Sequence, residues 1–171
     1  MATTIRTKRL ELTEFTVEDT PFILELLNTP GWLKFIGDRN VHTNEAAVGY
    51  LQNGPMASYR ENGFGLWKVS LHDGTPIGMC GLLKRTELEC PDIGFAFLPA
   101  YERQGYAFEA SSAALQRAKE VYHIAKLFAI VQPDNERSIS LLRRQGFQFV
   151  KLITVPPKGE VLQLHSLKLE R

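Results

Sequence analysis

The sequence has few cysteines, almost no net charge and no long apolar run, and each of these absences excludes a class of protein. Its 171 residues contain two cysteines, Cys80 and Cys90, so a disulfide framework is excluded and a reducing compartment is expected. The formal net charge is +1, which provides no overall field to attract nucleic acid or an anionic membrane. We therefore expect neither of these among its partners.

Metal-binding and targeting signals are missing as well. Two cysteines and four scattered histidines show none of the ligand spacings of a zinc site, so we expect no metal. The first residues lack the apolar segment of a signal peptide, and no stretch approaches the roughly 20 apolar residues of a membrane span. We expect a cytoplasmic protein in which residues 1–171 form a single domain, because this length suits one domain with its own core.

The hydrophobic pattern predicts one mixed sheet with helices on its faces, an α/β fold of the α+β kind. Helical spacing predicts helices over 16–28, 43–60, 105–121 and 136–144. Period-two or continuous apolar patterns predict strands over 9–15, 64–71, 77–85, 91–98, 126–132, 147–155 and 161–169. The intervening segment 29–42 has the character of a loop, although it carries aromatic residues.

The connection after strand 91–98 is the most informative part of the chain. Gly105 begins a helix there, and the first turn of a helix has unpaired N–H groups and a positive dipole end. Gly105 has no Cβ and Ala107 is small, so a diphosphate could approach this backbone closely. The alternative is that Gly105 is only a turn residue. A nucleotide-binding β-α-β protein is the last choice, because the P-loop and the three-glycine pattern are both absent.

Three motifs link the sequence to a known family. Pro99, Tyr101 and the run GYAFEA at 105–110 form the first, and TKRLEL at 7–12 forms the second. The third combines DNERS at 134–138 with RQGF at 144–147. In this order and spacing the chain resembles the GNAT superfamily of N-acetyltransferases, and most closely its RimJ/RimL-like branch.

This resemblance implies a fold and a cofactor. The fold is a mostly antiparallel twisted sheet of about six to seven strands flanked by about four helices. Strands 91–98 and 126–132 splay apart in it to hold acetyl-CoA, with CoA as the product. The main-chain amides of the loop would hold the pyrophosphate, through Arg103, Gln104, Gly105, Tyr106, Ala107 and Phe108.

The pantetheine arm has its own implied partners. The backbone around Phe97 and Leu98 would pair with it, and Asn135 and Ser138 would also contact the cofactor. For Asn135 the alternative role is the N-cap of the short helix, which does not exclude cofactor binding.

Two positions depart from the family pattern. Glu102 occupies the first position of the acyl-CoA signature, where glutamine or arginine is usual. Leu142 occupies the position of a tyrosine that serves many GNAT enzymes as general acid, which leaves Ser138 and Ser140 as the nearby hydroxyls. We expect Ser138 to be catalytic. A missing acid is tolerable because a thiolate, with an aqueous pKa near 8.5, leaves readily.

Asp92 is the candidate general base, since an attacking ammonium must lose a proton and burial would raise the pKa of a carboxyl toward useful values. The alternative is a solvated carboxylate at the start of a strand. Glu109 is a second candidate, but we expect it to brace the loop or the helix start. Cys80 could act as a covalent nucleophile, although a buried structural cysteine is the expected role.

The predicted function is transfer of an acetyl group from acetyl-CoA to a primary amine, by direct attack in a ternary complex. The acceptor is a protein N-terminal α-amine or a small-molecule amine, and monomer and homodimer are both open. A non-catalytic acyl-CoA binding or sensing module of the same fold is the alternative. The acceptor pocket is expected to use five aromatic or aliphatic residues, which could instead be core: Trp32, Phe35, Ile36, Phe64 and Trp67.

Overall fold

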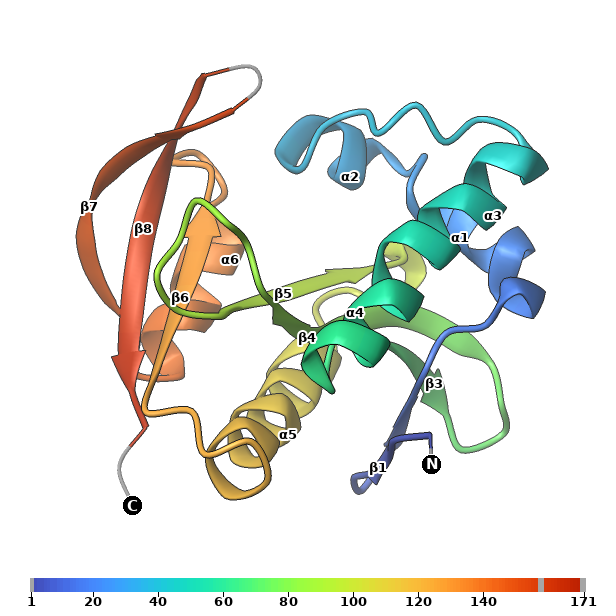
Figure 1. Cartoon of the computed structure of the whole chain (residues 1–171), viewed down its shortest axis with the longest axis horizontal. Helices are drawn as coiled ribbons and strands as arrows, with labels where there is room; N and C mark the ends of the chain where they lie inside the picture. Colours follow the sequence, from blue (N-terminus) through green and yellow to red (C-terminus); the bar gives the residue numbers. More distant parts are fainter. Residues whose placement is uncertain (1, 157–158, 170–171) are drawn as a thin grey trace.

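The chain forms an open eight-stranded sheet, shown in the computed structural model of Figure 1, which describes residues 2–156 and 159–169. The strand order is β1-β2-β3-β4-β5-β6-β8-β7. The bounds are β1 Thr4–Arg6, β2 Leu10–Thr13, β3 Leu66–Leu71, β4 Pro76–Leu83, β5 Asp92–Phe97, β6 Lys126–Val131, β7 Gln148–Val155 and β8 Glu160–Lys168. Every neighbouring pair is antiparallel except β5 and β6, which are parallel. This confirms the expected mixed, mostly antiparallel sheet.

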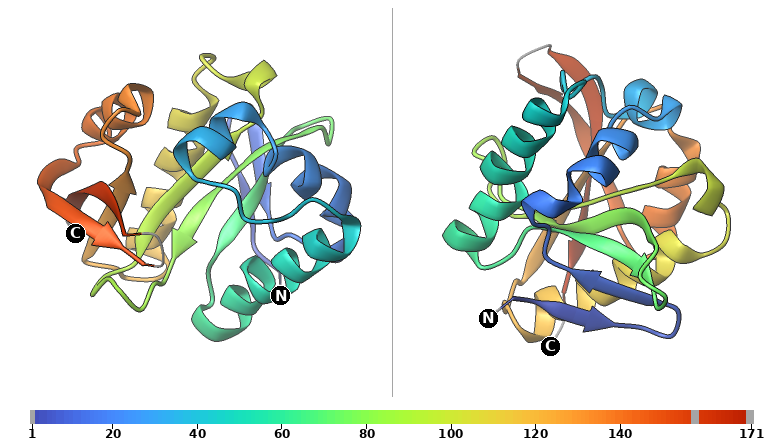
Figure 2. Two further views of the ribbon diagram at one scale, coloured as in Figure 1. Left: turned by 90° about the horizontal axis from the view of Figure 1, so that it is seen from above. Right: turned by 90° about the vertical axis from the view of Figure 1, so that its right-hand side faces the viewer.

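Helices cover both faces of the sheet (Figure 2). Their bounds are α1 Thr20–Leu26, α2 Pro30–Phe35, α3 Asn44–Asn53, α4 Pro55–Asn62, α5 Tyr106–Glu120 and α6 Glu136–Arg144. On one face of the sheet, α5 buries a row of alanines in one hydrophobic cluster: Ala110, Ala114 and Ala118. Small side chains allow this helix to lie close to the strands. On the other face α1 and α3 bury Phe22 and Leu51 in a second cluster.

The sheet divides between β5 and β6. Each of these strands has six residues, yet they share a single register pair, Asp92 with Phe128. The Phe128 N–H donates to the Pro91 carbonyl at 2.9 Å, and beyond this point the two strands diverge (Figure 1). β6 pairs instead with β8 along its whole length. The splayed strand pair that the family resemblance implied is therefore present.

The described residues contain more elements than the pattern predicted. β1 was missed because three residues are too short to show a period of two. α2 lies in the segment expected to be a loop, and its start has an N-cap, Thr29, whose side chain accepts from the Trp32 N–H, followed by Pro30. The expected helix 43–60 is divided at Gly54, because Pro55 has no N–H to continue the hydrogen-bond ladder and begins α4.

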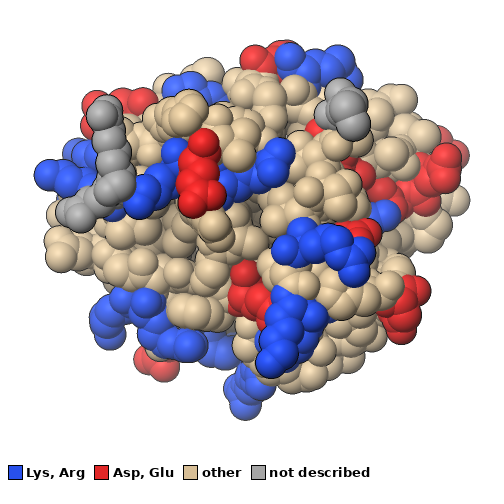
Figure 3. All heavy atoms as spheres, turned by 90° about the horizontal axis from the view of Figure 1, so that it is seen from below, with Lys and Arg blue, Asp and Glu red and all other residues tan. Residues whose placement is uncertain are grey.

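Charged groups of both signs are interspersed on the surface, as Figure 3 shows for one face. This distribution matches a formal net charge of +1. Among the described residues, no helix has the combination of length and apolar composition that a membrane crossing requires.

Candidate cofactor and acceptor site

A cleft of about 1580 Å³ lies where β5 and β6 diverge. Its walls come from α2, α3, β5, the connection before α5, the start of α6 and the β7–β8 hairpin. The structure brings most of the predicted site residues to this cleft: Asp92, Phe97, Arg103, Gly105, Tyr106, Ala107, Phe108, Asn135 and Ser138. Leu98 and Gln104 are not part of the cleft lining.

The loop at the start of α5 presents a run of free main-chain donors. Within the described part of the chain, none of the six N–H groups from Arg103 to Phe108 donates to another residue; the first intrahelical bond runs from Glu109 to the Gly105 carbonyl, at 3.0 Å. Arg103 and Gly105 both adopt left-handed backbone conformations, with φ of 61° and 84°. Alternating left- and right-handed residues direct successive N–H groups into one concave surface, which suits an anion.

Basic side chains surround this loop and offset the unfavourable Glu102. Arg137, from α6, lies 3.4 Å from the Glu102 carboxylate, so the acidic residue at the signature position is paired. Arg144 lies over the Phe108 ring, with its guanidinium carbon 4.5 Å from the ring centroid. Together with Arg103, these residues give the loop side of the cleft a local positive charge that the whole protein lacks.

At the free edge of β5, one of the two residues predicted to pair with the cofactor, Leu98, is not available. The Leu98 N–H donates to the Ile77 carbonyl at 2.8 Å, and the Leu98 carbonyl accepts from Tyr101 at 2.9 Å. Both backbone groups of Leu98 are therefore occupied within the protein. Because main-chain groups alternate along a strand, those of Phe95 and Phe97 point toward the gap beside β6. Phe95 thus replaces Leu98 as the neighbour of Phe97 at this edge.

Asp92 is fully buried at the point where β5 and β6 part. The Nε of Arg85 donates to both carboxylate oxygens at 3.1 Å. Burial raises the pKa of Asp92 to about 6, although the Arg85 charge and its hydrogen bond act in the opposite direction. The alternative of a solvated carboxylate is therefore wrong. A buried carboxyl with a pKa near 6, at the edge of a cleft, has the properties of a general base.

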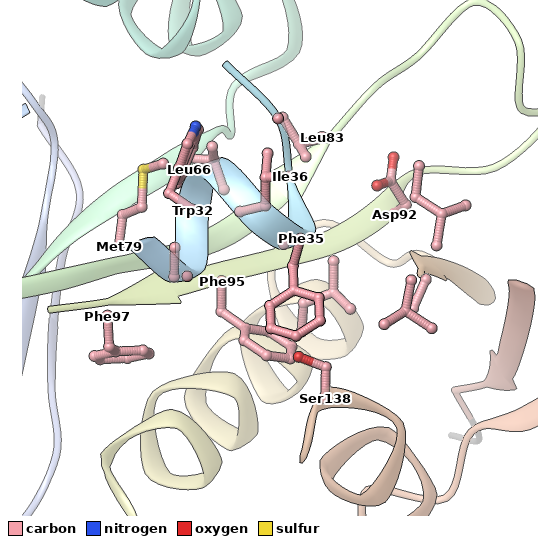
Figure 4. A pocket seen from close by; sticks show the side chains of 18 of the residues that line it. Trp32, Phe35, Ile36, Leu66, Met79, Leu83, Asp92, Phe95, Phe97 and Ser138 are labelled. Carbon is pink, nitrogen blue, oxygen red and sulfur yellow. The ribbon is translucent and has the colours of Figure 1, made fainter. Parts of the chain in front are cut away.

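Asn135 and Ser138 lie at the start of α6, across the gap. The Asn135 side-chain oxygen accepts from the Ser138 N–H at 3.3 Å, so the N-cap role is present. Figure 4 shows the Ser138 side chain directed into the cleft. It lies on the opposite side of the β5 ribbon from the side chain of Asp92. Leu142 is 2% exposed and packs in the core beneath α6, so the position of the family tyrosine carries an apolar contact here.

Two further candidates have structural roles. Glu109 faces the β1–β2 turn, where its carboxylate accepts hydrogen bonds from Thr7 and from Arg9, so it braces the start of the helix as expected. Cys80 is completely buried, burial raises the pKa of its thiol to about 12, and it does not line the cleft. No group of three or more His, Cys, Asp or Glu side chains suited to a metal occurs in the described ranges.

The acceptor side of the cleft contains three of the five predicted residues. Trp32, Phe35 and Ile36, all in or beside α2, line the wall opposite β5 (Figure 4). The prediction was wrong for Phe64 and Trp67, which do not line the cleft. Side chains alternate along β3, so Trp67 packs on the α5 side of the sheet while its neighbour Leu66 faces the cleft.

Sequence reasoning missed two polar residues of this wall. Arg85 follows β4 and pairs with Asp92 because the β4–β5 register places Leu83 opposite Asp92. Tyr50, from α3, also lines the cleft. Burial raises its pKa to about 12, against the charges of Arg39 and Arg85, so its hydroxyl stays neutral near pH 7. Reading residues 77–98 as a hairpin with this register would have identified Arg85, whereas no sequence signal identifies Tyr50.

An open sheet with one splayed parallel pair, a free-amide loop beside the gap and a buried carboxyl at its apex is the arrangement that the family resemblance implied. The sequence model described as Acetyltransferase (GNAT) domain matches residues 9–148. The chain therefore belongs to the GNAT acetyltransferase family. It is 30% identical over 161 residues to the uncharacterized N-acetyltransferase YnaD of Bacillus subtilis, covering 91% of this chain and 89% of that protein.

Solved structures agree on the fold. An acetyltransferase from Agrobacterium tumefaciens superposes with a TM-score of 0.82 at 22% identity, covering 96% of this chain and 94% of that one. RimL, a ribosomal L7/L12 α-N-protein acetyltransferase in complex with coenzyme A, superposes with a TM-score of 0.83 at 15% identity, covering 98% of both chains. The GNAT fold of this chain is thus one that holds coenzyme A in a solved neighbour.

Proposed function

We propose that residues 1–171 act as one N-acetyltransferase domain, which transfers an acetyl group from acetyl-CoA to a primary amine by direct attack in a ternary complex. The observation that carries this proposal is the loop beside the gap between β5 and β6, whose six N–H groups have no hydrogen-bond partner in the described part of the chain. A diphosphate fits the loop and an extended amide chain fits the gap, and coenzyme A contains both of these parts.

Different residues of the cleft would bind different parts of this cofactor. The amides of Arg103 to Phe108 would hold the diphosphate, and the free backbone groups of Phe95 and Phe97 would pair with the pantetheine arm as an added strand does. Asn135 and Ser138 would contact the same arm from α6. When bound, acetyl-CoA supplies an acetyl thioester, which is the activated acyl group for transfer.

Asp92 would accept a proton during the reaction, and Ser138 would donate a hydrogen bond to the leaving group. With a pKa near 6, Asp92 is ionised at neutral pH and can accept the proton that the acceptor ammonium must lose before its nitrogen attacks, directly or through water. Arg85 holds the carboxylate by its Nε and so fixes its orientation. The Ser138 hydroxyl, directed into the cleft, would donate a hydrogen bond to the departing sulfur.

Two acceptor classes, a protein N-terminal α-amine and a small-molecule amine, are compatible with this cleft. We propose testing peptide N-termini first, because RimL is named as an α-N-protein acetyltransferase and shares the fold. Phe35 at the end of α2 and the adjacent Ile36 would contact the apolar part of either acceptor, since they remain partly exposed in the wall opposite β5.

Calorimetric titration with acetyl-CoA tests the proposal directly. We expect micromolar-range binding to the wild-type protein and its loss in Gly105→Asp, because a side chain at this positive φ strains the free-amide loop and its Cβ would meet the Arg9 Nη2 at 3.2 Å. Gly74→Asp is the matched control, because Gly74 also has a positive φ, lies in the β3–β4 turn and is absent from the cleft lining. Failure of the folded wild-type protein to bind would overturn the proposal. Binding without turnover across an amine panel would favour a sensing module.

A further inference from the structure

The β1–β2 turn reaches across the molecule to the loop that precedes α5. Residues Thr7 to Leu10 form this turn, in which the Thr7 N–H donates to the Leu10 carbonyl at 2.9 Å and Leu10 donates back to the Thr7 hydroxyl at 3.1 Å. The turn presents the side chain of Arg9 toward α5, about a hundred residues away along the chain. The sequence motif TKRLEL is therefore joined in space to the GYAFEA motif.

Glu109 anchors Arg9 in a fixed position. Its carboxylate, 18% exposed, accepts from the Thr7 hydroxyl at 2.5 Å, from the Arg9 main-chain N–H at 2.8 Å and from the Arg9 Nε at 2.7 Å. Burial raises the pKa of Glu109, but these hydrogen bonds and the Arg9 charge outweigh burial and lower it. Glu109 is therefore ionised, and it neutralises the guanidinium that it holds.

The remaining contacts of Arg9 are with the loop itself. Its Nη1 donates to the Gln104 carbonyl at 2.9 Å, and its guanidinium carbon lies 4.3 Å from the centroid of the Tyr106 ring. The space beside Gly105 is also filled by Arg9, since a Cβ on Gly105 would lie 3.2 Å from its Nη2. One guanidinium thus contacts three consecutive residues.

The bond to the Gln104 carbonyl determines where the next N–H points. In a planar trans peptide the C=O and the following N–H point in opposite directions. Arg9 holds the Gln104 carbonyl toward the β1–β2 turn, so the Gly105 N–H is directed away from the turn. Gly105 lines the cleft, whereas Gln104 does not. Rotation of this peptide would remove a donor from the middle of the free-amide run.

We propose that Arg9 is a positioning residue for the diphosphate-binding loop, acting through the Gln104 carbonyl while Glu109 holds it in place. This inference rests on the proposed function, because it assigns a purpose to the loop that is meant to bind acetyl-CoA. Since Glu109 already neutralises its charge, Arg9 acts through geometry and not as a cation that attracts the phosphates.

The test is a comparison of Arg9→Ala and Arg9→Lys with the wild-type protein. Arg6→Ala is the matched control, because Arg6 belongs to the same hairpin but pairs with Glu11 at 2.6 Å and bonds the His72 ring, and within the described residues it has no hydrogen bond to the loop. Calorimetry gives the Kd of acetyl-CoA, steady-state kinetics gives kcat and KM, and thermal unfolding shows that each variant is folded.

We expect Arg9→Ala to raise the Kd and the KM of acetyl-CoA about tenfold, the effect of one lost charge-assisted hydrogen bond, with kcat within about twofold of wild type. Arg9→Lys should not restore binding, because one ammonium cannot bond both Glu109 and the Gln104 carbonyl in the same geometry. A merely structural role predicts the opposite pattern, in which kcat falls with the folded fraction and KM is unchanged.

The outcomes separate the two proposals. If wild type binds acetyl-CoA and Arg9→Ala binds it equally well, only the positioning role is wrong. The same conclusion follows if Arg6→Ala weakens binding as much as Arg9→Ala, or if Arg9→Lys binds like wild type. If wild type does not bind acetyl-CoA at all, the proposed function is wrong, and the role of Arg9 is wrong with it.

Discussion

Asp92 combines two properties at the scale of one residue: complete burial, and a position at the one register pair that joins β5 and β6 among the described residues. Burial favours the neutral acid, whereas Arg85 favours the carboxylate, and burial is the larger effect. The resulting pKa near 6 leaves Asp92 ionised at neutral pH but still basic enough to accept a proton. An exposed aspartate, with a pKa near 3.9, would be a weaker base.

This environment predicts how the rate depends on pH. Only ionised Asp92 can accept a proton, so kcat of the wild-type protein should rise as pH rises through about 6. Asp92→Asn should lower kcat about 100-fold and remove this rise. Initial rates between pH 5 and 8 measure both effects, and Glu89→Gln, an exposed acid outside the cleft lining, is the control. An unchanged acid limb in Asp92→Asn would show that another group is the base.

The same pKa also affects stability, with a sign that can be checked. The folded state holds the Asp92 proton more tightly than the unfolded state, whose carboxyl has a pKa of 3.8. The free energy of unfolding of the wild-type protein therefore falls as the pH rises from 4 to about 6. Asp92→Asn lacks this loss. Its stability relative to wild type should therefore increase over the same pH range in urea titrations.

At this scale the sequence was sufficient for some residues and not for others. Asp92, Gly105 and Asn135, which line the cleft, could be predicted there because their positions relative to strand and helix ends can be read along the chain. Arg85 and Tyr50 were not, since their proximity to Asp92 or to the cleft arises from pairing and packing between elements. Trp67 was misplaced because a period of two does not say which face of the sheet borders the cleft.

At the scale of an element, α6 depends on Asn135 for its first turn. Its side chain accepts from the Ser138 N–H, and it also lines the cleft, so one residue is expected to serve stability and binding. These roles use different atoms. The cap uses the carbonyl oxygen of the side chain, whereas the amide NH₂ is left for an acceptor on the cofactor.

Two substitutions separate these roles. Asn135→Ala should lower the free energy of unfolding by about 1 kcal/mol and also weaken acetyl-CoA binding, because it removes the cap and the donor together. Asn135→Asp keeps the cap oxygen, so we expect near wild-type stability with a raised KM for acetyl-CoA. Urea unfolding and steady-state kinetics measure the two effects. Wild-type KM in Asn135→Asp would leave Asn135 with the cap role alone.

Three features of the fold were not predicted from the sequence, each for a different reason: α2, the break between α3 and α4, and β1. α2 has a recognisable start, Thr29 followed by Pro30, but it is six residues long and shows no full period of apolar spacing. The break between α3 and α4 was also readable, since Gly54-Pro55 is a strong breaker within an otherwise helical pattern. β1 is defined only by its pairing with β2, which no local pattern of three residues reveals.

At the scale of the whole molecule, the sheet consists of two parts that β5 and β6 barely join. β1 to β5 form one part, and β6, β8 and β7 form the other (Figure 2). The gap between them leaves backbone donors and acceptors of β5 without strand partners on that side. A bound pantetheine would pair with these groups, so the cofactor would complete a sheet that the chain leaves open. Binding should therefore stabilise the joint between the parts.

Hydrogen exchange measures this effect along the chain. At acetyl-CoA concentrations 100-fold above the Kd, binding should contribute about 2.7 kcal/mol and raise Tm by roughly 5–10 °C. Protection should concentrate in the N–H groups of 103–108 and at the gap-facing positions Phe95 and Phe97, because within the described residues the former have no hydrogen-bond partner and the latter lie beyond the register pair of β5 with β6. Exchange in β1 to β3 should change only at the level of global unfolding. Gly105→Asp, treated identically, should show neither effect. Protection confined to α1–α4 would instead place the ligand on the acceptor side of the cleft, and the gap between β5 and β6 would then need another explanation.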